Sequence, residues 1–190
     1  MIAKAQSLDN FIDKSLYEKN KGYYQRKMEF GRRGDFITSP GISKLFSEMI
    51  AIWVVSFWEN LNKPEKINLV ELGAGNGELI EVLINTLNKL EIVKDKFKFF
   101  IFEKSVSLKK LQKKKFSKSV KWLDNFDKLP NFPTIFLANE FFDALPIKQF
   151  IKINEDWYEN FVLLNKSGKF SLEKKKLTSQ KRFSASCLKF

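Results

Sequence analysis

The stretch LVELGAGNGEL, residues 69–79, decides the fold. The stretch begins with the end of an apolar run, continues with three glycines at alternate positions, and ends where a pattern typical of a helix begins. The glycines, Gly73, Gly75 and Gly77, allow a sharp turn in which a ligand can approach the backbone closely. The start of the following helix offers unpaired backbone amides. The sequence therefore predicts a strand, a ligand-binding loop and a helix.

The spacing of the glycines indicates which ligand class fits the loop. Dinucleotide-binding loops have the pattern G-x-G-x-x-G, which would need a third glycine at position 78, where this chain has Glu78. A carboxylate, Glu71, stands two residues before the first glycine, and E-x-G-x-G-x-G resembles motif I of class I methyltransferases. A carboxylate beside the loop suits a ligand with an ammonium and a sulfonium group better than a pyrophosphate. The alternative is a glycine turn without any ligand.

The segments around this loop alternate between strands and helices. Helices are predicted over residues 78–90 and 105–115, the second with Ser105 as its cap, and a short apolar run predicts each of the strands Ile67–Leu72, Phe97–Phe102, Val120–Leu123 and Thr134–Ala138. Strands that alternate with helices predict a parallel sheet with right-handed crossovers. The expected fold class is therefore α/β, a Rossmann-like class I methyltransferase fold.

The flanking segments predict further elements. Residues 8–24 have helical spacing, and Ser39 with Pro40 starts a helix over residues 42–61. This helix has one apolar stripe: Ile42, Leu45, Phe46, Met49, Trp53, Phe57 and Leu61. Residues 148–153, 157–164 and 169–173 are predicted to be successive strands. The expected domains are N-terminal helices with their loop (1–62), the core (63–147), a β insertion (148–175) and a basic tail (176–190).

Polar residues follow the second and third predicted strands. Glu103 ends the strand that comes after the glycine loop, where an acidic residue can accept two hydrogen bonds from ribose hydroxyls. The alternative for Glu103 is a solvent-facing side chain beside Lys104. Asp124 and Asn125 follow the third strand and could bond an adenine amino group, although polar residues after a strand are also ordinary in loops.

The formal net charge of +12 raises the question of a nucleic-acid partner. Residues 166–190 carry eight Lys or Arg against one Glu, so most of the excess lies in the tail. A second cluster, residues 109–121, has seven lysines and no arginine, the residue preferred for bidentate phosphate contacts. A composition rich in Lys, Phe, Ile and Asn together is also what an A/T-rich genome produces. We therefore expect no dedicated nucleic-acid partner.

The chain has no histidine and one cysteine, Cys187. This composition excludes Ser-His-Asp catalysis, Cys-His catalysis, histidine-ligated metal and an internal disulfide bond. The longest apolar run, Met49 to Trp58, is about half of what a membrane span needs. We therefore expect no membrane span and chemistry carried by carboxylates, backbone amides, hydroxyls and a bound cofactor.

Four stretches resemble one family when they are taken together in this order. They are GRRGDFITSPGISKLFSE (31–48), LVELGAGNGEL (69–79), FEKSVSLKKLQ (102–112) and NEFFDALPIKQF (139–150). Together they are similar to the MidA-type methyltransferases, a family that includes a mitochondrial complex I assembly factor acting on an arginine. The resemblance covers roughly residues 15–165 and implies S-adenosyl-L-methionine as cofactor and a protein arginine as acceptor. A respiratory complex I subunit is the implied protein partner.

The resemblance also suggests roles for residues at two further places. Asn139, Glu140 and Asp143 follow the fourth strand, where ligands bind in open α/β sheets, and two carboxylates can orient a guanidinium. The alternative is helix capping by Asn139 and Asp143. Gly34, Asp35, Thr38 and Ser39 are expected to fold over the cofactor as a lid or pocket wall. For Ser39, the alternative is plain helix capping.

The chain departs from the family pattern at Gly41, Ser47 and Ala74, where members usually have Glu, Gly and Pro. Family members are also about twice as long and carry later strands, so we expect this chain to be C-terminally truncated. Two alternatives to a protein methyltransferase stay open: a non-catalytic domain that docks on a protein, and a nucleic-acid-directed methyltransferase. The expected compartment is the cytoplasm in a bacterium and the mitochondrial matrix in a eukaryote.

Overall fold

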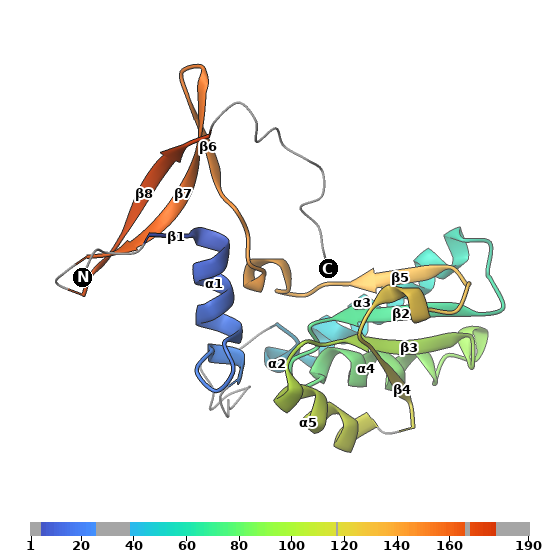
Figure 1. The fold of residues 1–190 in the computed structure, drawn as a ribbon. Helices are drawn as coiled ribbons and strands as arrows, with labels where there is room; N and C mark the ends of the chain where they lie inside the picture. Colours follow the sequence, from blue (N-terminus) through green and yellow to red (C-terminus); the bar gives the residue numbers. More distant parts are fainter. Residues whose placement is uncertain (1–4, 26–38, 117, 166–167, 178–190) are drawn as a thin grey trace. The chain divides into compact units, whose positions relative to one another are not determined.

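The computed structural model describes residues 5–25, 39–116, 118–165 and 168–177. The chain divides into two compact units (Figure 1). The first unit joins Met1–Tyr23 to Ala144–Phe190, and the second is Tyr24–Asp143. The glycine loop and the polar residues predicted to surround it belong to the second unit. The four-part division expected from the sequence stays a prediction.

A four-stranded parallel sheet forms the second unit. Its strands lie in the order β4 (Val120–Leu123), β3 (Phe97–Phe102), β2 (Ile67–Leu72) and β5 (Thr134–Leu137). Leu69 of β2 is level with Phe99 on one side and with Ile135 on the other. The carboxyl ends of all four strands therefore meet at one edge, which is where α/β sheets bind ligands.

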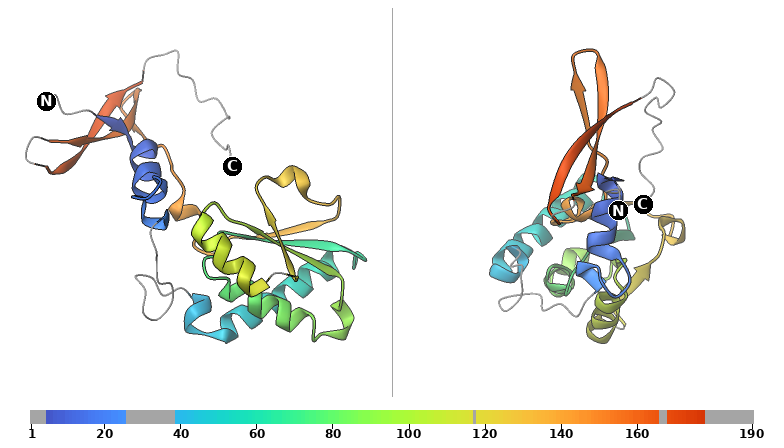
Figure 2. Two further views of the ribbon diagram at one scale, coloured as in Figure 1. Left: turned by 60° about the horizontal axis from the view of Figure 1, so that its bottom comes forward. Right: turned by 60° about the vertical axis from the view of Figure 1, so that its left-hand side comes forward.

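Three helices cover one face of this sheet: α3 (Lys44–Asn60), α4 (Glu78–Leu87) and α5 (Val106–Phe116) (Figure 2). They pack on alternate residues of the strands, among them Ile67 and Leu69 of β2. The intervening residues Val70 and Leu72 belong to a smaller cluster on the opposite face. Short 3₁₀ turns complete the unit: η1 (Tyr23–Gln25), η2 (Glu91–Val93), η3 (Phe126–Lys128) and η4 (Phe142–Ala144), of which η1 and η4 cross its boundaries.

The four predicted strands are confirmed, as is the fold class. The strand ends agree to within a residue because each apolar run is bounded by charged or turn-forming residues. Ser105 also caps α5 as predicted, because its Oγ accepts a hydrogen bond from the amide of Leu108 at 3.4 Å. The helix predicted over residues 8–24 is shorter, since α1 is Leu8–Tyr17.

The helix predicted over residues 42–61 is interrupted near its start. Ser39 and Pro40 open a separate four-residue helix, α2 (Ser39–Ile42), and α3 begins only at Lys44. The interruption lies at Ser43, whose extended backbone (φ −142°, ψ 119°) precedes the first residue of α3. Ser39 therefore starts α2 and does not cap the long helix.

The apolar stripe identified on this helix is not the face that packs in the core. Apart from Phe46, which is half-buried, the stripe residues are 39% to 65% exposed. The face packed in the core carries Ser47, Ala51, Val54 and Trp58. The small side chains of Ser47 and Ala51 allow α3 to approach its neighbours closely, and this outweighs the larger area of the stripe. The helix has apolar residues around most of its circumference, so periodicity alone could not select the face.

The first unit contains an antiparallel sheet and α1. The long strand β7 (Asp156–Leu164) pairs with β6 (Phe150–Ile153), with the two-residue β1 (Gln6–Ser7) and with β8 (Phe170–Lys176). The predicted strands after residue 148 are therefore confirmed. The added strand β1 was not predicted, because two residues carry no detectable alternation.

Within the described ranges, no helix is long and apolar enough to cross a membrane. The same residues contain no group of three or more His, Cys, Asp or Glu side chains able to hold a metal ion.

Candidate active site

The glycine loop connects β2 to α4 at the carboxyl edge of the sheet. All three of its glycines have positive φ: 67° at Gly73, 56° at Gly75 and 82° at Gly77. A side chain at Gly77 would collide with the ring of Phe116, and one at Gly73 would meet the ring of Phe141 at 2.7 Å. At Gly75, no described atom lies within 4 Å of such a position. The approach expected for a ligand is therefore open at Gly75, while aromatic rings occupy it at the other two glycines.

Side chains of the loop region satisfy the first amides of α4. The carboxyl group of Glu71 accepts a hydrogen bond from the backbone amide of Ile80. The amide of Glu78 donates to Oδ1 of Asn76 at 3.3 Å. An anion would have to compete with these oxygens for the helix start. This arrangement agrees with the expectation that the loop does not hold a pyrophosphate.

Glu71 itself is buried, and its Oε2 has no hydrogen-bond partner among the described residues. Burial raises the pKa of this carboxyl group from 4.5 to about 8, and the nearby charge of Glu103 adds to the rise. A buried oxygen without a partner costs free energy that a cationic donor would recover.

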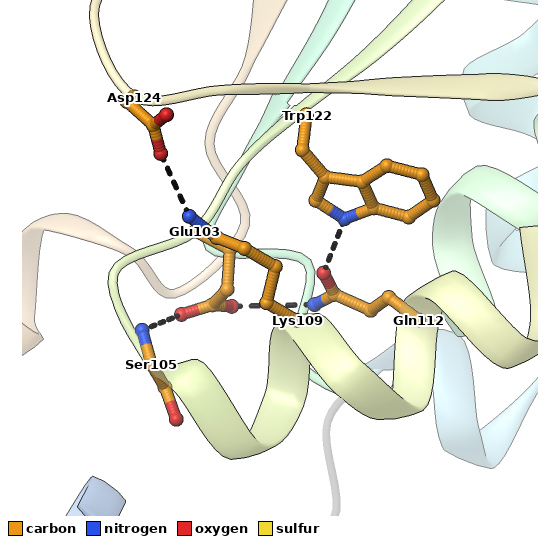
Figure 3. Close-up of polar contacts among 6 residues, drawn as sticks. All are labelled: Glu103, Ser105, Lys109, Gln112, Trp122 and Asp124. Carbon is orange, nitrogen blue, oxygen red and sulfur yellow. Dashed lines mark hydrogen bonds and ion pairs between the residues drawn. The ribbon is translucent and has the colours of Figure 1, made fainter. Parts of the chain in front are cut away.

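Glu103 follows β3 and lies at the same edge as the glycine loop. Its Oε1 accepts a hydrogen bond from the backbone amide of Ser105 at 2.8 Å, and its Oε2 accepts one from Nε2 of Gln112 at 3.3 Å (Figure 3). Burial raises the pKa of Glu103, and these hydrogen bonds and the charge of Lys109 oppose the rise. The side chain is buried beside the loop, so the alternative of a solvent-facing glutamate is wrong. Each carboxylate oxygen retains a lone pair for a further donor.

Gln112 is a residue of this site that the sequence interpretation missed. Its Nε2 also donates to the carbonyl oxygen of Gly75 at 2.8 Å, and its Oε1 accepts from Nε1 of Trp122 at 2.9 Å. A signal was present in the sequence, because Leu108, Gln112 and Phe116 recur every four residues on a helix otherwise rich in lysine. An uncharged polar residue in the centre of that buried stripe indicates a specific hydrogen-bonding role.

Asp124 and Asn125 follow β4, as predicted, and both are exposed. The Oδ1 of Asp124 accepts a hydrogen bond from Nζ of Lys109 at 2.9 Å (Figure 3). This hydrogen bond, together with the charge of Lys109, lowers the pKa of Asp124. The adenine contacts expected of both residues stay predictions.

Asn139, Glu140 and Asp143 follow β5 at this edge. Glu140 has a φ of +49°, which is uncommon for a residue other than glycine. The next residue, Phe141, places its ring against Gly73. The chain after β5 therefore returns to the glycine loop. The roles expected of Asn139, Glu140 and Asp143 stay predictions.

Tyr24 is a second residue that the sequence interpretation missed. Burial raises the pKa of its hydroxyl group, and the charges of Asp143, Glu103 and Glu140 raise it further. Its carbonyl oxygen accepts a hydrogen bond from Oγ of Ser105 at 2.9 Å. Glu103 therefore shares one neighbourhood around Tyr24 with Glu140 and Asp143, which follow it by about 40 residues in the sequence. No sequence pattern indicated this role, because Tyr24 belongs to no recognisable motif.

Of the predicted lid residues, Gly34, Asp35 and Thr38 lie outside the described residues. Ser39 is described, at the start of α2. The same short helix places Gly41 against the Glu78 side chain, because a side chain at Gly41 would meet Oε2 of Glu78 at 2.7 Å. Ser39 therefore lies two residues before a contact with the start of α4.

A family model described as "Putative S-adenosyl-L-methionine-dependent methyltransferase" matches residues 49–189. The chain belongs to this methyltransferase family. The match includes the glycine loop, Glu103 and the segment after β5. The family membership expected from the four sequence stretches is thereby confirmed.

Curated relatives of this methyltransferase family member are mitochondrial proteins. The protein arginine methyltransferase NDUFAF7 of Xenopus laevis is 30% identical over 181 residues, 82% of this chain and 41% of the relative. The Drosophila melanogaster homologue is 33% identical over 172 residues, 78% and 39% of the two chains. The human protein is 30% identical over 177 residues, which are 80% of this chain and 40% of the relative. The chain thus spans about two-fifths of the length of these relatives.

Two crystal structures from Burkholderia thailandensis have a similar fold. One of them is bound to S-adenosyl-homocysteine and has a TM-score of 0.73 at 27% identity, over 91% of this chain and 46% of that chain. The other is a native structure with a TM-score of 0.70 at 26% identity, over 93% of this chain and 45% of that chain.

The residues of this methyltransferase family member fit an S-adenosyl ligand in chemical terms. The loop is open at Gly75, and the buried Oε2 of Glu71 lacks a donor among the described residues. The carboxyl group of Glu103 lies at the same sheet edge and can accept hydroxyl donors. These features suit a ligand that carries hydroxyl groups and positive charge.

Proposed function

We propose that this chain binds S-adenosyl-L-methionine at the glycine loop and Glu103, and takes part in methyl transfer to a protein arginine. The observation that carries the proposal is the buried carboxyl group of Glu103, which Gln112 ties to the carbonyl of Gly75. The loop and the acidic residue thereby form one binding surface. Family membership supports the same reading.

Glu103 would accept hydrogen bonds from the ribose hydroxyls. Glu71, whose pKa of about 8 keeps it largely protonated in the free chain, would face the positively charged part of the ligand and release its proton there. The open face of Gly75 would allow a ligand to contact the backbone. Asp124 and Asn125 would lie toward the adenine. When bound, S-adenosyl-L-methionine supplies a methyl group already activated by attachment to a sulfonium sulfur.

Glu140 and Asp143 would hold the guanidinium group of the acceptor. A guanidinium has a pKa above about 12 and loses its proton reluctantly, so paired carboxylates are needed to orient one nitrogen. The same carboxylates would accept the proton that the nitrogen releases. Tyr24 supports this assignment, because the charges of Glu103, Glu140 and Asp143 all raise the pKa of its hydroxyl group. An acidic neighbourhood in a chain of net charge +12 suits a cationic acceptor.

The acceptor is proposed to be a protein, because the curated relatives are named as protein arginine methyltransferases. A respiratory complex I subunit is the specific candidate that follows from the family resemblance. The mitochondrial names of the relatives support the matrix as the compartment if the source is a eukaryote. For a bacterial source, the cytoplasm stays the prediction.

The experiment combines binding with transfer. The chain is titrated with S-adenosyl-homocysteine by calorimetry, and then incubated with S-adenosyl-L-methionine carrying a labelled methyl group and arginine-containing peptides from complex I subunits. We expect saturable binding and label on arginine. Binding without transfer would favour the alternative of a non-catalytic docking domain. Absence of binding by a folded chain would refute the proposal.

The nucleic-acid alternative receives little support from the lysines of α5. Lys109 pairs with Asp124, and Lys115 pairs with Glu81 at 2.5 Å. Lys113 lies over the ring of Trp122. Part of the cluster is therefore engaged within the protein. RNA binding that disappears at modest salt concentration would identify the remaining lysines as non-specific contacts.

A further inference from the structure

Gln112 occupies a buried position of α5 where packing alone would favour an apolar side chain. It is fully buried and stands one turn from Leu108 and one turn from Phe116 on the inner face of α5. A buried amide is costly unless all its polar atoms are paired. The polar atoms of Gln112 must therefore have specific hydrogen-bond partners.

The partners of Gln112 fix the orientation of its amide. The indole Nε1 of Trp122 can only donate, so the atom facing it at 2.9 Å must be the oxygen. The carbonyl of Gly75 can only accept, so the atom at 2.8 Å must be the nitrogen. The second hydrogen on that nitrogen points to Oε2 of Glu103 at 3.3 Å. A flipped amide would lose all three hydrogen bonds at once.

We propose that Gln112 is a positioning residue that couples the glycine loop to Glu103, so that both present their ligand-binding atoms in one fixed arrangement. The inference rests on the proposed function, since it assigns Gln112 a role toward the ligand that the loop and Glu103 would bind. Gln112 does not itself contact the ligand. It acts through the backbone of Gly75 and the carboxylate of Glu103.

The geometry gives this coupling a clear physical basis. Gly75 is the loop residue at which space is open, and glycine samples positive and negative φ about equally, so a hydrogen bond to its carbonyl restricts a peptide that would otherwise vary. Ser105 holds the other oxygen of Glu103, so Gln112 fixes the rotation of the carboxylate about its own axis. Trp122 of β4 in turn fixes Gln112 (Figure 3). The arrangement thus joins β2, β3, β4 and α5 at the ligand-facing edge.

The test uses the full chain and two probes, S-adenosyl-homocysteine and its analogue without the ribose 2′-hydroxyl. Calorimetry gives the affinity ratio of the two probes, which reports how well Glu103 is aligned. We expect the wild type to prefer the natural probe by ~10-fold, the loss of one charge-assisted hydrogen bond. Gln112→Met keeps the side-chain volume but removes the hydrogen bonds, and we expect the ratio to approach unity.

A matched control separates positioning from general destabilisation. Leu108→Ala removes packing from the same buried face of α5 and should lower the melting temperature while leaving the ratio of the two probes unchanged. If Gln112→Met does not fold, Trp122→Phe serves instead, because it removes the donor that fixes the Gln112 oxygen. We expect Trp122→Phe to lower the ratio as well.

A spectroscopic readout follows the same contacts without any mutation. In ¹⁵N-labelled protein, the resonance of the indole N–H of Trp122 should shift on addition of S-adenosyl-homocysteine. A ligand at Gly75 and Glu103 would alter their hydrogen bonds to Gln112, and Gln112 accepts the indole hydrogen bond. The indole of Trp58 provides an internal control, since it donates to the carbonyl of Pro64 at 2.8 Å, three residues before β2 begins. We expect its resonance to stay in place.

The outcomes distinguish this inference from the proposed function. A wild type that binds neither probe, or binds both equally, would refute the ligand role of Glu103 and with it the inference. A wild type that discriminates, together with a Gln112→Met or Trp122→Phe variant that discriminates equally well, would refute the inference alone and leave the proposed function intact.

Discussion

The carboxyl group of Glu71 at the end of β2 accepts a hydrogen bond from the backbone amide of Ile80 in the first turn of α4. This bond spans the glycine loop and ties the strand to the helix that follows it. It also places a buried acid in a region of low dielectric constant, with Oε2 unpaired among the described residues. The chain thus keeps an acid where an amide would be less costly, and this has measurable consequences for stability.

Glu71→Gln should remove part of the pH dependence of stability. The pKa of Glu71 is raised from 4.5 to about 8 in the folded protein, so the folded state holds the proton more tightly than the unfolded state. The stabilising contribution is therefore full at acidic pH and is lost as pH rises toward 8, at no more than ~1.4 kcal/mol per pH unit. Urea denaturation of both proteins between pH 5 and pH 8 measures it. Parallel stability curves would contradict the buried, protonated state of Glu71.

Gly77→Ala and Gly75→Ala should differ in their cost to folding. Both positions have positive φ, and this alone costs a side chain ~1–2 kcal/mol. At Gly77 the added methyl group also collides with Phe116, which adds ~1–3 kcal/mol, whereas Gly75 is open. Chemical denaturation should therefore show the larger loss for Gly77→Ala. Gly75→Ala should mainly weaken S-adenosyl-homocysteine binding. Equal destabilisation would contradict the loop geometry.

Much of the second unit could be predicted from the sequence, for identifiable reasons. The runs at Ile67–Leu72 and Phe97–Phe102 are short, apolar and bounded by polar residues, which is the pattern of buried parallel strands. The glycines at alternate positions determine a turn because each has positive φ. Local sequence was sufficient to predict the features that depend on backbone conformation alone, such as strands and turns.

The sequence did not predict which side chains meet across elements. Gln112, Trp122 and Tyr24 gain their roles from contacts with distant segments, and no local pattern encodes those contacts. The packing face of α3 was missed for a related reason. Its choice depends on the close approach that Ser47 and Ala51 allow, and not on which stripe has the greater apolar area.

A pair of substitutions in α3 tests the corrected packing face. Val54→Ala removes a fully buried side chain and should cost ~1–3 kcal/mol of unfolding free energy. Ile52→Ala, two residues away and 51% exposed, should change stability by no more than ~0.5 kcal/mol. Urea denaturation of both variants provides the comparison. A larger loss for Ile52→Ala would show that the exposed face is packed in solution.

Substitution of the carboxylates after β5 tests the proposed acceptor site. Glu140→Gln and Asp143→Asn keep the shape of the side chains but remove the charge that would hold a guanidinium, so methyl transfer should fall by ~10²-fold or more. Their affinity for S-adenosyl-homocysteine should stay unchanged, because neither residue is assigned to that ligand. Labelled methyl transfer and calorimetry measure the two effects separately. Full transfer activity in both variants would remove Glu140 and Asp143 from the acceptor site.

The most direct measurement is calorimetric titration of the wild-type chain and of Glu103→Ala with S-adenosyl-homocysteine at neutral pH. We expect saturable binding by the wild type, and a loss of ~1–3 kcal/mol in Glu103→Ala from missing hydrogen bonds to a charged group. Circular dichroism of both proteins establishes that they are folded. Equal affinity in the two proteins, or no binding heat from a folded wild type, would contradict the claim that the glycine loop and Glu103 hold one adenosyl ligand.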